Sequence, residues 1–264
     1  MKGRNESMTT GLLEQIAYVH LPVTRMDESL AWYERHLGAK MTGKPREDLG
    51  FLSFPSGANV LLIGTCKSAR AAFYRGEELN QVFGFRTTRL VELHRKLSEG
   101  GVRVTPLVFE AHGNFFYFFD PDGNYFMVHE LPDVAGQPDD PWVEGIKYVE
   151  LPAADLSRTV KWYVETLGFD HRGSGNPELA FLDLNPGPHL LLWQTPDKVT
   201  ANIYRGEREH HAVGFRTSRI EALHRHLLQA GVRVGEIEEA GTIGRFVHFY
   251  DPTGNLFMAH EPRD

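Results

Sequence analysis

The chain has 264 residues, a formal net charge of −7 and a single cysteine, Cys66. This charge, without a clustered basic run, argues against a nucleic-acid-binding protein, and one cysteine excludes an internal disulfide. Because no apolar run reaches membrane-spanning length and no signal peptide is recognisable at the start, we expect a cytoplasmic protein without a membrane partner.

The first predicted elements are a strand, a helix and three further strands. Residues 16–23 alternate apolar and polar, as expected for a half-covered strand. The following segment carries one apolar stripe and should be a helix that stops at Gly38. This stripe comprises Met26, Leu30, Tyr33 and Leu37. Strands are then expected near residues 39–43, 49–54 and 58–65.

The same order of elements occurs again within the first half. A strand at 82–85 precedes a helix with Leu90, Leu93 and Leu97 on one face. Strands are predicted near residues 102–107, 114–119 and 124–130. The sequence Asp120-Pro121-Asp122-Gly123 has the residue preferences of a type I turn before the last strand.

The whole pattern is then repeated at an offset of about 130 residues. Residues 74–77, 84–87 and 120–124 recur at 204–207, 214–217 and 251–255. A constant offset indicates two copies of one domain. We therefore predict an α+β protein of four βαβββ modules, paired into two half-open barrel domains. The predicted divisions are a flexible tail (1–13), a first domain (14–131), a linker (132–144) and a second domain (145–264).

These motifs resemble the vicinal oxygen chelate superfamily, which includes glyoxalase I, extradiol dioxygenases and bleomycin-binding proteins. The resemblance rests on His20-Leu21-Pro22-Val23, Trp32-Tyr33 and Leu37-Gly38, on their counterparts at 150–153, 162–163 and 167–168, and on the repeated turn before each last strand. It implies two glyoxalase-like domains, each a concave cup with helices outside. The reaction is not implied, because this fold supports many chemistries.

The resemblance also implies where a metal would be bound, and these positions carry unsuitable residues. Relatives place His, Gln or Glu ligands on the first, fourth, fifth and eighth strands of a domain. The matching positions here are Tyr18, Leu62, Val82 and Met127, then Tyr148, Leu192, Ala212 and Met258. None is a good ligand for a divalent ion. We therefore expect both usual metal sites to be lost.

Better ligands occur two residues further along the same strands. They are His20 and His129 in the first half, and Glu150, Gln194 and His260 in the second. Because a step of two keeps a side chain on the same face, each set could meet inside a cup. Two interpretations remain open. The residues could form a displaced site for one divalent ion (Fe, Mn, Ni or Zn) or for a polar ligand. Alternatively, they are polar only because the strands reach solvent there. If the second half is an enzyme, Glu150 and His260 are its candidate catalytic groups.

Other residues could line the cups without binding metal. Tyr18 and Tyr148 lie on the first strands, and Tyr117 and His248 occupy matching seventh-strand positions. We include them, with His20, His129 and Gln194, among candidate ligand-binding residues. The adjacent His210 and His211 are interpreted as a surface pair in preference to a ligand pair, since neighbours on a strand point to opposite faces.

Two functions are compatible with these patterns. The first is a glyoxalase- or bleomycin-resistance-like protein that binds a small aromatic or polar ligand in a cup. The alternative is a divalent-metal-dependent lyase or dioxygenase that uses a displaced site in the second domain. The expected partner is a small molecule, and the protein is expected to be a monomer, with its two halves replacing a dimer, or a homodimer.

Overall fold

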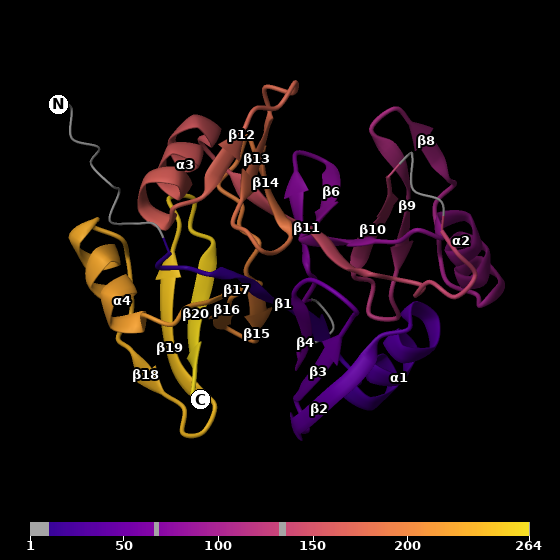
Figure 1. The fold of residues 1–264 in the computed structure, drawn as a ribbon, viewed down its shortest axis with the longest axis horizontal. Coiled ribbons are helices and arrows are strands. Elements are labelled where there is room, and N and C mark those ends of the chain that lie inside the picture. Colours follow the sequence, from indigo (N-terminus) through magenta and orange to yellow (C-terminus); the bar gives the residue numbers. More distant parts are fainter. Residues whose placement is uncertain (1–10, 66–68, 132–135, 264) are drawn as a thin grey trace.

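The computed structural model describes residues 11–65, 69–131 and 136–263 (Figure 1). Cys66, most of the predicted tail and residues 132–135 of the predicted linker lie outside this part. Within it, no helix is both long enough and apolar enough to span a membrane.

Four modules with the predicted order of elements make up the fold. The first comprises β1 (Gln15–Val23), α1 (Met26–Leu37), β2 (Lys40–Arg46), β3 (Leu49–Ser53) and β4 (Asn59–Gly64). The second comprises β7 (Phe83–Arg86), α2 (Leu90–Glu99), β8 (Val108–Glu110), β9 (Gly113–Phe119) and β10 (Tyr125–Glu130). A hairpin of β5 (Ala72–Arg75) and β6 (Glu78–Gln81) joins them.

The second half repeats this arrangement. Its first module comprises β11 (Gly145–Ala153), α3 (Leu156–Trp162) with the π-helical turn η1 (Tyr163–Leu167), β12 (Asp170–Arg172), β13 (Leu179–Asp183) and β14 (His189–Gln194). Its second comprises β17 (Val213–Arg216), α4 (Ile220–Gln229), β18 (Glu238–Glu239), β19 (Gly244–Tyr250) and β20 (Leu256–Pro262). The joining hairpin is β15 (Ile203–Arg205) and β16 (Arg208–His210).

The strand predicted at 102–107 is wrong. Val104 makes only an isolated bridge to Phe118, and the short strand β8 forms later. The second half shows the same pattern without a proline, since Val234 makes an isolated bridge to Phe249 and β18 forms later, so this segment is a feature of the module itself.

Each eight-stranded sheet combines modules from both halves of the chain. The first and fourth modules form one sheet, in which β1 is antiparallel to β17. The second and third modules form the other, in which β7 is antiparallel to β11. Figure 1 shows α1 and α2 at one end and α3 and α4 at the other, and each sheet extends from one end toward the other. Residues expected to converge within one half are therefore distributed over two sheets.

The repeated turn holds the two modules of each half together. Asn124 donates to the Pro22 carbonyl at 3.0 Å and to the Asp120 carboxylate at 2.7 Å. Asp120 also accepts a 2.6 Å hydrogen bond from the buried Tyr33 hydroxyl. Asn255 makes the corresponding bond to the Pro152 carbonyl. The turn is thus conserved between the halves for a structural reason: it joins the helix of one module to the last strand of the next.

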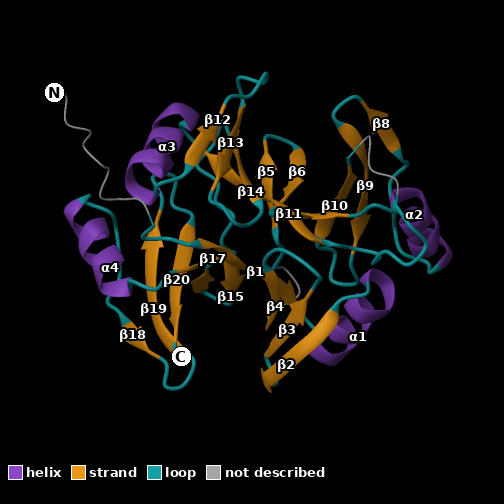
Figure 2. Ribbon diagram, in the orientation of Figure 1, coloured by secondary structure: helices purple, strands orange, loops and turns teal. Residues whose placement is uncertain are grey.

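The helices cover the outer faces of both sheets and leave the inner faces concave (Figure 2). The predicted stripe of α1 is buried, and the helix ends at Gly38, whose φ of 70° favours glycine. We call the concave face of the first sheet, around Tyr18, His20 and His248, cup A. The concave face of the second sheet, around Tyr117, Tyr148 and Glu150, is cup B.

Candidate functional site

Three histidines meet at the floor of cup A. His20 projects from β1, His210 is the last residue of β16, and His211 lies in the link between β16 and β17. One ring nitrogen from each lies within 4.8 Å of those of the other two. His20 Nδ1 and His210 Nε2 share a 2.8 Å hydrogen bond, and the His211 ring centroid is 4.3 Å from both neighbouring rings.

The surface location predicted for His210 and His211 is therefore wrong. His211 is 4 % exposed, and His210 is half-buried. The rule that neighbours alternate applies only within a strand, and His211 lies in the link just after β16. Without that alternation, both rings can turn toward His20.

The environment keeps these imidazoles neutral. Burial lowers the pKa of His20 and of His211 well below the ordinary value, and the nearby histidines lower both further. Burial lowers the pKa of His210 to about 4, with smaller contributions from Arg205 and His248. Neutral imidazole is the form that binds metals.

Two nitrogens of this cluster are buried without a hydrogen bond. Among the described residues, Nε2 of His20 and Nε2 of His211 have no partner. A buried polar atom of this kind costs about 1–3 kcal/mol, so native proteins rarely leave one unpaired. Two such atoms, belonging to adjoining rings, indicate that the cluster accommodates a ligand.

His248 and a tyrosine–histidine pair extend the polar lining of cup A. The His248 ring lies 5.2 Å from His211, and its Nδ1 is 3.6 Å from the Glu238 carboxylate. The Tyr18 hydroxyl lies 2.9 Å from His260 Nδ1, while His260 Nε2 lies 2.9 Å from the Ile243 carbonyl. Because that carbonyl can only accept, Nε2 carries the proton and Nδ1 accepts from Tyr18.

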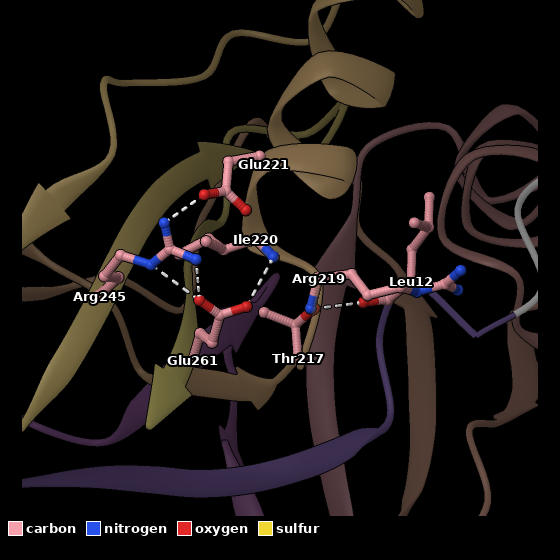
Figure 3. Close-up of polar contacts among 7 residues, drawn as sticks. All are labelled: Leu12, Thr217, Arg219, Ile220, Glu221, Arg245 and Glu261. Atoms are coloured by element: carbon pink, nitrogen blue, oxygen red, sulfur yellow. Dashed lines mark hydrogen bonds and ion pairs between the residues drawn. The ribbon is translucent and has the colours of Figure 1, made fainter. Parts of the chain in front are cut away.

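The adjacent acidic residue Glu261 faces away from cup A, as alternation requires. Figure 3 shows its carboxylate bonded to Arg245 and to the backbone N–H of Ile220 at the start of α4. Glu130 does the same in the other sheet, where it accepts from the N–H of Leu90. Neither glutamate is available to the cups.

Glu150 occupies the floor of cup B. Its carboxylate accepts hydrogen bonds from Gln81 and, at 2.7 Å, from Trp193 Nε1. Burial raises the pKa of Glu150 to about 7, although both hydrogen bonds and Arg75 oppose this shift. The half-buried rings of Tyr117 and Tyr125 stack nearby, with centroids 4.8 Å apart.

Cup B also contains His129, which pairs with a lysine. His129 Nδ1 lies 2.9 Å from Lys147 Nζ, and its ring is 5.7 Å from that of Tyr148. Burial lowers the pKa of His129 to about 4, and Lys147 lowers it further. His129 and His20 lie on different sheets, so the structure does not bring this predicted pair together.

The predicted set of Glu150, Gln194 and His260 is not brought together either. Glu150 lies in cup B and His260 in cup A. Gln194 points to the helix side, where it accepts from the N–H of Leu156 at the start of α3. Trp193, not Gln194, shares the face of Glu150. The sequence did not indicate which residues of β14 face the cup, because this strand has apolar residues on both faces.

The positions that hold the metal in the vicinal oxygen chelate superfamily carry residues that are unsuited to bind an ion in either cup. Tyr18 is engaged with His260, while Leu62 is buried beneath the helices, in register with Leu21. The other matching positions are Val82, Met127, Tyr148, Leu192, Ala212 and Met258. Among the described residues, the three-histidine cluster is the group of His, Cys, Asp and Glu side chains that could hold a metal.

Comparison with known proteins agrees with the repeated fold. A proposed dioxygenase from Bacillus subtilis subsp. subtilis is 14 % identical, with a TM-score of 0.74 over 97 % of this chain and 87 % of its own. Glyoxalase I from Zea mays is 19 % identical, with a TM-score of 0.68 over 94 % of this chain and 92 % of its own. No curated protein sequence matches.

The family assignment comes from the sequence of both halves. Residues 15–128 and 145–259 each match the model of one family. These two matches span most of the chain and correspond to the two copies seen in the fold. The chain therefore belongs to the Glyoxalase/Bleomycin resistance protein/Dioxygenase superfamily.

Proposed function

We propose that this protein is a divalent-metal-dependent enzyme of the vicinal oxygen chelate type, with its metal centre in cup A. His20, His210 and His211 would be the ligands. The observation that carries this proposal is the convergence of three neutral imidazoles, two of which have buried, unpartnered Nε2 atoms. The centre lies across both halves of the chain, not in the second half alone.

The donor set favours particular metals. Imidazole nitrogen suits zinc, nickel and iron, whereas manganese prefers sites rich in carboxylate. In a tetrahedral site, metal–nitrogen bonds of about 2.0–2.1 Å place two ligand atoms roughly 3.4 Å apart. The nitrogens, within 4.8 Å of one another, must therefore approach by up to roughly 1.4 Å.

Three protein ligands leave coordination positions for a substrate, as in catalytic zinc sites. A bound ion would act as a Lewis acid toward substrate oxygens. The chain itself would supply proton transfer through Tyr18, whose hydroxyl proton points to His260 Nδ1. His260 is held for this role by the Ile243 carbonyl and by Phe246, whose ring stacks on it at 4.4 Å.

The test is metal binding by the purified chain. After treatment with EDTA and re-addition of zinc, nickel or iron, wild type should retain close to one ion per chain. H20A and H211A should retain almost none, whereas H171A, at an exposed position, should match wild type. Retention below about a tenth of an ion per chain by folded wild type would exclude the proposal.

A second candidate function is binding of a small aromatic or polar molecule in cup B without metal. It is favoured by the half-buried rings of Tyr117, Tyr125, Tyr148 and Trp193, which surround Glu150. Concave sites with aromatic walls and few polar groups are typical of ligand pockets. Thermal-shift screening of EDTA-treated protein with planar compounds would detect it, and a W193F variant that responds like wild type would argue against cup B.

A monomeric or homodimeric cytoplasmic protein stays a prediction. The pairing of modules across the halves favours the monomer, since both sheets are already completed within one chain. Sedimentation analysis would decide between the two states.

A further inference from the structure

A separate pocket of about 270 Å³ lies where the two sheets meet. Its walls are the loop between β3 and β4, the beginning of β11 and the loop before β14. Ser56 and Gly145 form a backbone bridge beside it, which fixes the first loop against β11. The lining residues are Gln15, Ser56, Gly57, Arg86, Ile146, Lys147, Pro186, Gly187, Pro188 and His189.

The lining of this pocket is positively charged, although the protein as a whole is negative. It includes Lys147 and Arg86 and no acidic residue. Arg86 is neutralised from outside the pocket by Glu144, at 2.5 Å. His189 is likewise held by Asp183, at 2.5 Å. Among the described residues, Lys147 is the cation of this lining that forms no ion pair.

Lys147 has no carboxylate within ion-pair distance among the described residues. Its Nζ donates to His129 Nδ1 at 2.9 Å and lies 5.0 Å from the centre of the Tyr148 ring. An ammonium carries three N–H donors, so this bond leaves donors available. Burial lowers the pKa of Lys147 to about 8, and Arg86 lowers it further, although Glu144 opposes the shift. A bound anion would relieve that cost.

The fold does not need a lysine at this position. At the repeat offset of 130 residues the counterpart of Lys147 is Ala17, beside Tyr18 and His260. Those residues correspond to Tyr148 and His129, so the same strand and the same histidine occur without a cation. A purely structural role for Lys147 therefore has no parallel in the other copy.

We propose that this pocket binds the carboxylate of a small planar organic acid, with Lys147 Nζ as its ion-pair partner. A monoanion matches one uncompensated ammonium better than a doubly charged phosphate does. The volume admits an aromatic acid, and the rings of Tyr148 and His189, with centroids 6.1 Å apart, flank the lysine. The site is independent of the three histidines and of any metal.

Isothermal titration with benzoate tests this, using EDTA-treated protein so that metal-bound carboxylate cannot contribute. Wild type should bind benzoate saturably, acetate more weakly and inorganic phosphate least. K147Q and K147M should each lose about tenfold or more in affinity, as expected for removal of a partly desolvated ion pair. K161Q, which changes an exposed lysine of α3, should bind like wild type.

Three results would overturn the proposal. They are the absence of benzoate binding, equal affinity in a folded K147Q or K147M protein, and binding of phosphate in preference to benzoate. Circular dichroism identifies the folded variants. Because metal is absent throughout, none of these results bears on the three-histidine centre, and loss of metal binding would leave this proposal standing.

Discussion

Cups A and B are built from the same positions of the repeat and differ in whether their polar groups satisfy one another. His20 and His211 of cup A correspond, 130 residues apart, to Glu150 and Gln81 of cup B. In cup B the carboxylate accepts from the amide, so the pair is complete. In cup A both positions are imidazoles, and each has an unpartnered nitrogen. At these two positions the polar groups of cup B satisfy each other, whereas those of cup A retain two nitrogen atoms that a ligand could bind.

The hairpins over the two cups show what the copies share. Arg205 of the β15–β16 hairpin pairs with Asp48 at 2.5 Å and bonds to the Gly64 carbonyl. Arg75 of the β5–β6 hairpin is 3.9 Å from Glu178, the counterpart of Asp48, and 4.4 Å above the Trp193 ring. The arginine of each hairpin thus ties it to the opposite half of the chain.

The largest expected effect comes from giving cup A the residues of cup B. The double substitution H20E/H211Q should abolish metal binding and keep the fold, because Glu150 and Gln81 show that this pair is compatible with it. Elemental analysis and circular dichroism check both points. Because the introduced carboxylate can itself bind zinc, the decisive comparison is H20A/H211A, and one zinc ion per chain in that variant would show that these positions are not the ligands.

Glu150 should give cup B a pH effect opposite in sign to that of the neutral histidines of cup A, whose contribution to the free energy of unfolding falls as the pH drops below their ordinary pKa. Burial holds the pKa of Glu150 near 7, above its ordinary value of 4.5, so the folded state binds this proton more tightly than the unfolded state. Its contribution to the free energy of unfolding is therefore most favourable below pH 4.5. It should fall by on the order of 3 kcal/mol as the pH rises to about 7.

Urea unfolding of wild type and E150Q at pH 5 and pH 8 measures this effect. The glutamine cannot ionise, so E150Q should lose this part of the pH dependence. E178Q, at an exposed position, should keep it. An unchanged slope in E150Q would mean that the carboxyl titrates normally.

The shared turn should respond equally in both halves. N124A and N255A each remove bonds to a buried aspartate and to a carbonyl of the first strand. Each should lower the free energy of unfolding by about 2 kcal/mol, because buried groups are left unpaired. Denaturant titration of the two variants would reveal unequal costs, which would contradict a common role.

The smallest expected effect is a difference between the hairpins. Since His210 ends β16, zinc should slow hydrogen exchange in residues 203–210 by a few-fold and leave residues 72–81 unchanged. Exchange followed by mass spectrometry reads both hairpins in one sample. D48N should reduce the protection without abolishing it, and equal protection of both hairpins would indicate a non-local effect.

The sequence predicts the modules well because their signals are local. Period-two alternation, the stripe from Met26 to Leu37 and the glycine stop each depend on neighbouring residues. The strand expected at 102–107 was wrong because Val102 and Val104 alternate as in a strand, whereas Val104 forms only an isolated bridge, as its counterpart Val234 does. The pairing of modules was not predictable in the same way. The first module could pair with the second or with the fourth, because both offer a comparable strand edge.

The candidate site was predicted only in part. His20 was identified as a cup residue. Its partners His210 and His211 were not, because they lie in the second half of the chain, at the end of β16 and in the link that follows it. Gln194 was assigned to the wrong face because Leu190, Leu191 and Leu192 are apolar on both sides of β14. The sequence did contain a signal for the three-histidine cluster. His210 and His211 immediately precede the fifth-strand metal position, and the residue that corresponds to His211 in the other copy, Gln81, is also polar.

The exchange of modules between sheets means that neither half is a complete body on its own. A fragment ending near residue 131 would expose the free edges of β1 and β7, both of which hydrogen-bond to the other half. After cleavage of the connecting peptide, the two pieces should stay together through the β1–β17 and β7–β11 strand pairs. This topology predicts that two separately produced halves assemble with each other when mixed.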